Sequence, residues 1–273
     1  MSASTPTSRK QTRRERRAAE RAEAGALRRD HQASRRRGGS PILLITLLVG
    51  AIGIVLVAGA LLIGGRPAAP GPATTALNAP TSPTPIELAA DRTLGRAAAP
   101  VTLELWSDFQ CPVCGQFART VEPALISRYV TSGTLRIVHH DAAFQGAKSS
   151  AAYDESVEAA AGARCAAAQG RYWPFHDWVF ANQIGENKGA FSVDRLQAVA
   201  TASGLDVGAW QACVATGEQQ QAVRDETRQA LAGGVNATPT MRLNGSVIVG
   251  LRGATEMGDM IEAAAAAAAA AGG

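Results

Sequence analysis

A run of 22 residues without a charged side chain, residues 42–63, constrains this chain more than any other feature of its sequence. As a helix with a rise of about 1.5 Å per residue it would extend roughly 33 Å, enough to cross the roughly 30 Å hydrocarbon layer of a bilayer once. A secretory signal peptide has a shorter apolar region, of about 7 to 15 residues. The pattern therefore predicts a retained membrane anchor at 41–64, with cleavage in the small-residue stretch 64–73 as the alternative.

Charge divides the chain at the same point. Residues 1–40 contain 12 of the 27 Lys and Arg residues but 4 of the 23 Asp and Glu residues, a local net charge of +8 in a chain with a total of +4. Because Lys and Arg accumulate on the cytoplasmic side of a membrane span, this tail is predicted to be cytoplasmic and the chain beyond the anchor extracytoplasmic. Attraction to anionic lipid also explains the tail, so nucleic-acid binding is the less favoured interpretation.

Proline-rich sequence follows the predicted anchor. Six of the 13 prolines lie within residues 66–85, among Ala, Thr, Ser and Gly, and such a composition cannot bury a hydrophobic core. We therefore assign residues 65–87 to an extended linker, which at about 3.1 Å per residue could reach on the order of 60 Å from the bilayer. The remaining residues, 88–273, are predicted to form one folded domain.

The first part of that domain has the pattern of a strand, a helix and a second strand. Residues 101–106 are apolar and β-branched, and apolar residues then recur at steps of four from Cys111 until Gly133 ends the pattern. Residues 135–139 follow as a second short strand. This order implies a right-handed βαβ crossover in a sheet covered by helices, which belongs to the α/β class.

An Ala-rich stretch at about 147–233 separates this unit from the C-terminal strands. It is predicted to be a helical insertion that is broken at four glycine-containing points. Beyond it, residues 240–243 and 246–249 are predicted to be short strands joined by Asn244-Gly245, a dipeptide that favours a two-residue hairpin turn. A last helix begins at about residue 255.

Cys111 and Cys114 form a Cys-Pro-Val-Cys motif where the first strand gives way to the helix. Unpaired N–H groups and the positive end of the helix dipole stabilise a thiolate at such a position. Pro112 suits the first turn, where a missing N–H has no intrahelical partner. Cys114 continues the apolar stripe and is predicted to be buried, whereas Cys111 is predicted to be exposed. This asymmetry predicts that Cys111 attacks and Cys114 resolves.

The alternatives for this motif are a structural disulfide and half of a zinc site. Zinc needs further ligands at suitable spacing, and the next cysteines, Cys165 and Cys213, lie far along the chain without a close Cys or His partner. Both are predicted to point inward from helices, either as a structural disulfide or as two free thiols. An oxidising compartment outside the membrane favours the disulfide.

Three segments together resemble the DsbA-like thioredoxin-fold thiol:disulfide oxidoreductases, especially membrane-anchored bacterial members. They are SDFQCPVCGQF at 107–117, RCAAAQGRYWPFHDWVFANQ at 164–183 and GVNATPTMRLNG at 234–245. The resemblance implies a thioredoxin fold with an inserted helical subdomain, preceded by the one transmembrane helix. It also makes Pro239 the family's cis-proline facing the motif. Thr238 would then bind substrate peptide through its backbone, as an added strand.

The resemblance also implies an activity. Cys111 and Cys114 would form disulfides in exported cysteine-containing proteins without an organic cofactor or a metal, and a membrane redox partner, DsbB-like or vitamin K epoxide reductase-like, would reoxidise them. The same site would also suit a disulfide reductase or isomerase. The alternative from another class is a membrane-tethered peptide-binding or chaperone module in which the motif is structural.

Two acidic residues, Glu104 and Asp108, lie near the motif. Glu104 lies seven residues before Cys111, one out of step with the acidic residue of many relatives, so no proton-transfer role is assigned to it. Asp108 either opposes a Cys111 thiolate or is solvated. No histidine stands between the two cysteines, which favours a less oxidising disulfide. Three histidines complete no metal or triad pattern and are predicted to pack or to form hydrogen bonds: His139, His140 and His176.

Overall fold

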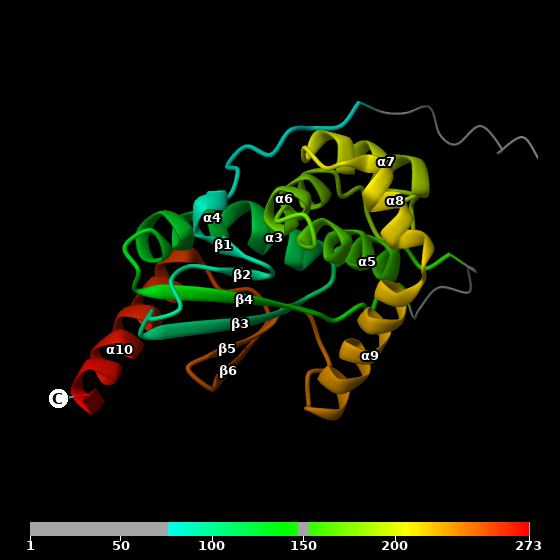
Figure 1. Ribbon diagram of the computed structural model, residues 1–273. Helices are drawn as coiled ribbons and strands as arrows, with labels where there is room; N and C mark the ends of the chain where they lie inside the picture. Colours follow the sequence, from blue (N-terminus) through cyan, green and yellow to red (C-terminus); the bar gives the residue numbers. More distant parts are fainter. Residues whose placement is uncertain (1–75, 147–152, 273) are drawn as a thin grey trace, which may run out of the picture. The chain divides into compact units, whose positions relative to one another are not determined.

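The structure, a computed structural model, describes residues 76–146 and 153–272, which belong to one compact unit spanning residues 74–273 (Figure 1). The predicted basic tail at 1–40 and the predicted anchor at 41–64 lie outside the described residues. Within the described ranges, no helix is both long enough and apolar enough to cross a membrane.

Six strands form one mixed sheet in the order β1-β2-β4-β3-β5-β6. Its centre is the parallel pair β3 (Val101–Ser107) and β4 (Leu135–Asp141), in which Leu103 lies opposite Ile137. Both side chains are fully buried, as the apolar sequence of these two segments predicts for central strands. The predicted βαβ unit is therefore present, because the chain between the two strands is helical.

The C-terminal hairpin completes one side of the sheet. β5 (Thr240–Leu243) pairs antiparallel with β3 and turns tightly into β6 (Ser246–Val249). Asn244 and Gly245 have φ angles of 44° and 91°, and a two-residue hairpin turn of this kind requires two positive values. On the other side lie β1 (Ala89–Ala90) and β2 (Thr93–Leu94), which the sequence does not predict, since two-residue strands show no alternating pattern.

The helix predicted to begin at Cys111 is divided into three pieces. α3 (Pro112–Thr120) is followed by α4 (Glu122–Leu125) and by the π-helical turn η2 (Ile126–Val130). Pro123 explains the break between α3 and α4, because its ring lacks an N–H and clashes with the carbonyl group four residues earlier. The prediction of one continuous helix is therefore wrong at this point, although the three pieces still connect β3 to β4.

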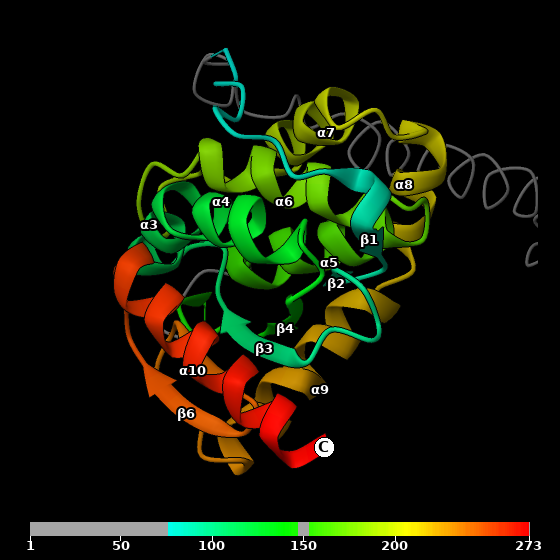
Figure 2. The same cartoon turned by 90° about the vertical axis from the view of Figure 1, so that its left-hand side faces the viewer.

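The described residues of the predicted insertion form five helices between β4 and β5. Positive φ angles at Gly170, Gly204 and Gly217 separate successive helices without the strain that a Cβ atom would cause. α9 packs against both α5 and β4, and α10 (Ala254–Gly272) packs against β3 and α4, as Figure 2 shows from the side of α10. The five helices are α5 (Glu155–Ala167), α6 (Tyr172–Ala181), α7 (Val193–Ala202), α8 (Val207–Ala215) and α9 (Glu218–Ala232).

The last part of the predicted linker is attached to the domain. The Asn182 side chain accepts a hydrogen bond from the N–H of Asn78 and donates one to its carbonyl oxygen, at 2.8 and 2.9 Å. The Asp177 carboxylate accepts bonds from the N–H and the hydroxyl of Thr84, at 2.7 and 3.1 Å. Residues 76–85, called the strap below, are therefore held to α6 before the short 3-10 helix η1 (Ile86–Leu88) begins. Side chains far along the chain cause this attachment, so the composition of the linker does not reveal it.

Candidate active site

Cys111 lies where the loop after β3 enters α3. It is the N-cap residue of the helix, and Pro112 occupies the first turn. Only 3% of Cys111 is exposed, so the prediction of an exposed Cys111 is wrong. The reason is tertiary, because the loop before β5 approaches the sulfur and the Cys111 Sγ lies 3.4 Å from the carbonyl oxygen of Thr238. The prediction of a buried Cys114 agrees with its exposed fraction of 2%.

The two thiols differ in acidity. The pKa of Cys111 is lowered to about 5, chiefly by a hydrogen bond from the Cys114 thiol and further by the N–H groups of Val113 and Cys114 at the helix N-terminus. Burial raises the pKa of Cys114 well above its ordinary value, and the nearby Cys111 thiolate raises it further. Near neutral pH the reduced pair therefore holds one thiolate, on Cys111, and one protonated thiol, on Cys114.

The loop before β5 faces this pair. Its Thr238-Pro239 peptide bond is cis. The loop is tied to the C-terminal hairpin because the N–H of Gly250 donates to the Pro239 carbonyl at 2.8 Å, and the Thr240 hydroxyl donates to the Ala237 carbonyl at 2.7 Å. The structure thus brings Thr238, with Pro239 next in the chain, to Cys111 across 127 residues of sequence.

Asp108 is buried and not solvated, since only 2% of it is exposed. Its carboxylate accepts hydrogen bonds from the N–H groups of Gln110 and Gln145, both at 2.8 Å, and from the Ser156 hydroxyl at 2.7 Å. Burial raises the pKa of Asp108 to about 6, although these hydrogen bonds act in the opposite direction. The carboxylate fixes the loop before Cys111 to the first turn of α5, and its charge opposes a thiolate on Cys111.

Glu104 of β3 contacts a histidine of the neighbouring strand β4. Its Oε1 is 3.6 Å from Nε2 of His140, whose Nδ1 is 2.9 Å from a carboxylate oxygen of Glu226. These contacts link Glu104 to His140 of β4 and, through His140, to Glu226 of α9. The other two histidines are buried and hydrogen-bonded, His139 with the Tyr172 hydroxyl at 2.6 Å and His176 with Asp177 at 3.0 Å.

The four cysteines form two different pairs. A disulfide joins Cys165 of α5 to Cys213 of α8, whereas Cys111 and Cys114 are free thiols. In the part of the chain that the structure describes, no three His, Cys, Asp or Glu side chains gather as metal ligands. The two free thiols of the described residues therefore lie together at the start of α3.

Two glutamines that the sequence analysis does not single out contact the motif or its neighbours. The Gln183 side chain donates hydrogen bonds to the carbonyl oxygens of Phe109 and Cys111, at 2.6 and 3.0 Å. Gln110 donates to the Ser156 hydroxyl at 3.1 Å and accepts from the N–H of Asn187. By itself a glutamine after a helix is typical of an exposed loop and does not indicate a role at the motif. The only sequence signal for Gln183 is that it ends the 164–183 segment, which resembles the family.

Comparison with known proteins identifies the fold. A family model described as thioredoxin matches residues 87–263. The solved structure of oxidised BdbD from Bacillus subtilis is similar over 69% of this chain and 99% of its own, with a TM-score of 0.58 and 21% identity. At that identity the likeness concerns the fold. The predicted thioredoxin fold with an inserted helical subdomain is confirmed.

Two curated relatives show the range of proteins that contain similar sequence. Na(+)/H(+) antiporter NhaA 1 of Mycolicibacterium gilvum is 26% identical over 163 residues, which are 59% of this chain and 24% of the antiporter. This chain therefore spans about a quarter of the length of that relative. Probable disulfide bond formation protein D of Bacillus anthracis is 25% identical over 159 residues, which are 57% of this chain and 70% of that protein.

Proposed function

Because the chain belongs to the thioredoxin family, we propose that it is a DsbA-like thiol:disulfide oxidoreductase that forms disulfide bonds in exported proteins through Cys111 and Cys114. The observation that carries the proposal is the difference in acidity between the two thiols, with the acidic one at the start of α3 beside Thr238. A purely structural bridge needs no such difference. Similarity to the disulfide bond formation protein of B. anthracis gives further support.

In the proposed reaction the oxidised pair accepts two electrons from a substrate dithiol. A substrate thiolate attacks Cys111 Sγ, the Cys111–Cys114 bond breaks, and Cys114 leaves with the electron pair and takes up a proton. A second substrate thiolate then attacks the substrate sulfur of the mixed disulfide, and Cys111 leaves as a thiolate. The lowered pKa of Cys111 favours this second departure, and the raised pKa of Cys114 favours its protonation. The Thr238 backbone would hold the substrate as an extended strand.

Substitution of each cysteine separates the two steps. Cys111→Ser should abolish oxidation of a reduced dithiol peptide, because the attacked sulfur is lost. Cys114→Ala cannot form the internal disulfide and should also fail to oxidise the reduced peptide. Offered the oxidised peptide instead, its Cys111 thiolate should attack the peptide disulfide and accumulate a mixed disulfide, because no Cys114 thiol remains to displace the peptide. The peptide product and the enzyme adduct are both measured by mass spectrometry on the full chain. Full oxidase activity in either variant would contradict the proposal.

The direction of electron flow follows from the reduction potential of the pair. We propose to equilibrate the full chain with graded glutathione buffers and to count alkylated cysteines by mass. A midpoint near or above about −180 mV supports an oxidase, whereas a midpoint near about −270 mV supports the reductase or isomerase alternative. A pair that does not titrate supports a peptide-binding or chaperone module with a structural motif.

We also propose that the domain stands outside the cytoplasm on a single membrane anchor at 41–64, with a DsbB-like or vitamin K epoxide reductase-like partner in the same membrane. The uncharged stretch at 42–63 and the basic tail before it support this topology. The Cys165–Cys213 disulfide suits an oxidising compartment. Protease added to spheroplasts should remove the domain at 88–273 and leave the basic tail, and protection of the domain would contradict the topology.

A further inference from the structure

The loop that follows α6 holds the backbone of the redox motif through one side chain. Nε2 of Gln183 lies 2.6 Å from the carbonyl oxygen of Phe109 and 3.0 Å from that of Cys111. Both partners can only accept hydrogen bonds, so the nitrogen of the amide must face them. The amide oxygen then faces the guanidinium of Arg119, at 3.4 Å. Both N–H groups and the oxygen of this amide therefore have partners of the right kind.

Helix α3 leaves room for this contact at Gly115. The N–H of Gly115 bonds at 3.0 Å to the same Cys111 carbonyl oxygen that Gln183 contacts. A Cβ atom at Gly115 would lie 2.0 Å from Oε1 and 2.7 Å from Cδ of Gln183. Glycine is unfavourable inside a helix relative to alanine. The missing Cβ atom at this position is what allows Gln183 to cross the first turn of α3.

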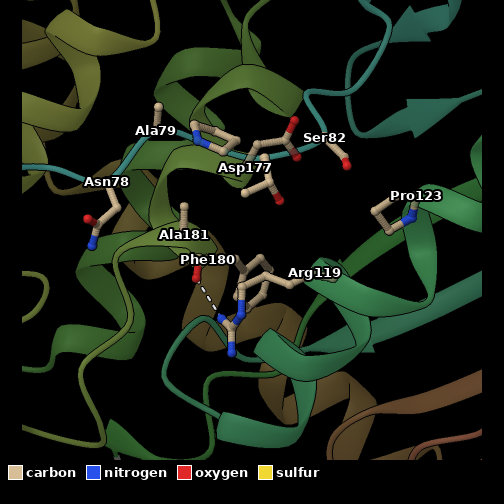
Figure 3. A pocket seen from close by; sticks show the side chains of 11 residues that line it. Asn78, Ala79, Ser82, Arg119, Pro123, Asp177, Phe180 and Ala181 are labelled. Carbon is tan, nitrogen blue, oxygen red and sulfur yellow. Dashed lines mark hydrogen bonds between the residues drawn. The ribbon is translucent and has the colours of Figure 1, made fainter.

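Gln183 is held in place by the neighbouring residue Asn182 and by Arg119 of α3. The neighbouring Asn182 donates to the Trp178 carbonyl at 2.8 Å and is bonded to the strap, so the end of α6 is fixed. From α3, the guanidinium of Arg119 donates to the Phe180 carbonyl at 2.6 Å, as the dashed line in Figure 3 shows. The Arg119 bond therefore joins α3 to α6 beside the Gln183 contact, while the Asn182 bonds fix the end of α6. The amide cannot leave the motif without a change in one of these neighbours or in its own rotamer.

We infer that Gln183 is a positioning residue for Cys111, acting through the carbonyl groups on either side of Gln110. By holding these carbonyls, Gln183 keeps the backbone that carries Sγ in place against the N-terminus of α3. There the N–H groups of Val113 and Cys114 stabilise the Cys111 thiolate. The inference rests on the proposed function, because the residue it positions is the one that exchanges disulfides.

Gln183→Met tests the inference, because methionine keeps the length and packing of the side chain but donates no hydrogen bond. The acid ionisation constant of Cys111, followed by thiolate absorbance on the reduced full chain, should fall roughly threefold, which is about half a pKa unit. The equilibrium with glutathione should shift toward the Cys111–Cys114 disulfide, since the thiolate form loses stabilisation. A merely structural role would lower the melting temperature and leave both equilibria unchanged.

Gly115→Ala provides a second, independent variant. Its Cβ atom would displace the ends of Gln183 and Arg119, which are flexible, so the helix should still form. We expect the same direction of change as in Gln183→Met. The double variant should change no more than either single variant, because both substitutions remove one shared contact. Gln221→Ala is the matched control, since this glutamine lies on the surface of α9 and bonds to Asp225.

Two results would overturn the inference. One is an unchanged ionisation constant and glutathione equilibrium in a Gln183→Met chain that melts as a folded protein. The other is an additive effect of the two substitutions. A wild-type chain in which Cys111 and Cys114 do not titrate at all would overturn the proposed function instead, so the two failures are distinguishable.

Discussion

At the scale of single residues, the acidity of the redox pair depends on groups in the first turn of α3, on Thr238 and on burial in the core. Cys111 receives a hydrogen bond from the Cys114 thiol and lies at the free N–H groups of α3, whereas Cys114 is surrounded by the core. The charge of Asp108 opposes the thiolate, and this opposition is overcome by the closer donors. The two cysteines of one motif therefore have opposite pKa shifts.

The lowered pKa of Cys111 predicts how alkylation depends on pH. In the reduced chain the Cys111 thiolate is present above a pKa of about 5, so its rate of alkylation should be nearly constant from neutral pH upward and should fall as the pH drops through about 5. Cys114 should remain unmodified over the same range. Pulse labelling with iodoacetamide and mass spectrometry measures both rates. A half-maximal rate near the ordinary cysteine value of 9.0 would contradict the prediction.

Glu122 is a buried carboxyl group whose protonation affects stability. Burial raises its pKa to about 7 from 4.5, against the opposing effect of His176, while Asp177 adds to the increase. Its Oε1 has no hydrogen-bond partner within the described residues, and its Oε2 lies 3.8 Å from Nε2 of His176. Because the folded-state pKa is raised, the contribution of Glu122 to stability is complete below about 4.5 and is lost as the pH rises through about 7.

Glu122→Gln should therefore stabilise the chain in alkaline solution. Glutamine keeps the shape of the side chain and removes the buried charge, so the melting temperature should rise at about pH 8 and change little at about pH 5. Differential scanning calorimetry on the variant and the wild type at both pH values makes the comparison. An equal change at both values would show that packing and not charge is responsible.

At the scale of secondary-structure elements, the helical insertion is joined by a covalent bond and by close aromatic packing. The Trp210 indole of α8 donates to the Gly162 carbonyl of α5 at 2.9 Å, and a Cβ atom at Gly162 would lie 3.0 Å from ring atoms of Phe175 and Trp210. The Cys165–Cys213 disulfide connects the same two helices. α5 and α8 are therefore joined by a disulfide, by a hydrogen bond and by aromatic packing around Gly162.

Removal of that disulfide should weaken the fold and leave the redox pair unchanged. The two cysteines are separated by 48 residues, so the Cys165→Ala, Cys213→Ala double variant should lose about 4 kcal/mol of unfolding free energy in the chain-entropy account of disulfides. Denaturant titration measures this loss. Glutathione equilibration should give the wild-type midpoint for Cys111 and Cys114, and a shifted midpoint would mean that the disulfide also affects the active site.

For four of the strands, the local sequence pattern is sufficient to predict the secondary structure. The strands at 101–107, 135–141, 240–243 and 246–249 agree with the predicted ones, because β-branched runs and the Asn244-Gly245 turn act over a few residues. The division of the helix at Pro123 is a local effect as well, and the apolar periodicity conceals it. The two-residue strand β2 depends instead on pairing with β4, which is 43 residues or more away in the register, and β1 pairs in turn with β2.

At the scale of the whole molecule, the strap attaches the end of the predicted linker to the half of the domain that contains the active site. It bonds to Asp177 and Asn182, and the latter precedes Gln183, which contacts the motif. The strap borders a cavity of about 200 Å³ (Figure 3). The other side of this cavity is lined by residues of α3 and α6, among them Ala118, Arg119, Phe180 and Ala181. The place where the chain leaves the domain is thus close to α3 and α6.

Asn182→Ala should release one end of the strap. The variant loses the hydrogen bonds to the N–H and carbonyl of Asn78, so a protease should cut the full chain near residue 78 faster than in the wild type. Limited proteolysis with mass mapping of the fragments gives the rates, with Gln221→Ala as a surface control. A rate equal to that of the control would mean that Thr84 and Asp177 suffice to hold the strap.

The sequence by itself determined the elements that local physics controls: the central strands, the hairpin turn, the glycine breaks of the insertion, and a cysteine pair at a helix N-terminus. Tertiary structure alone decided the surroundings of that pair. It buried Cys111, brought Thr238 to the sulfur, bonded Asp108 to α5 and placed Gln183 over Gly115. These contacts join residues that are far apart in the chain. Periodicity and turn chemistry act over a few residues and cannot specify which distant surfaces meet.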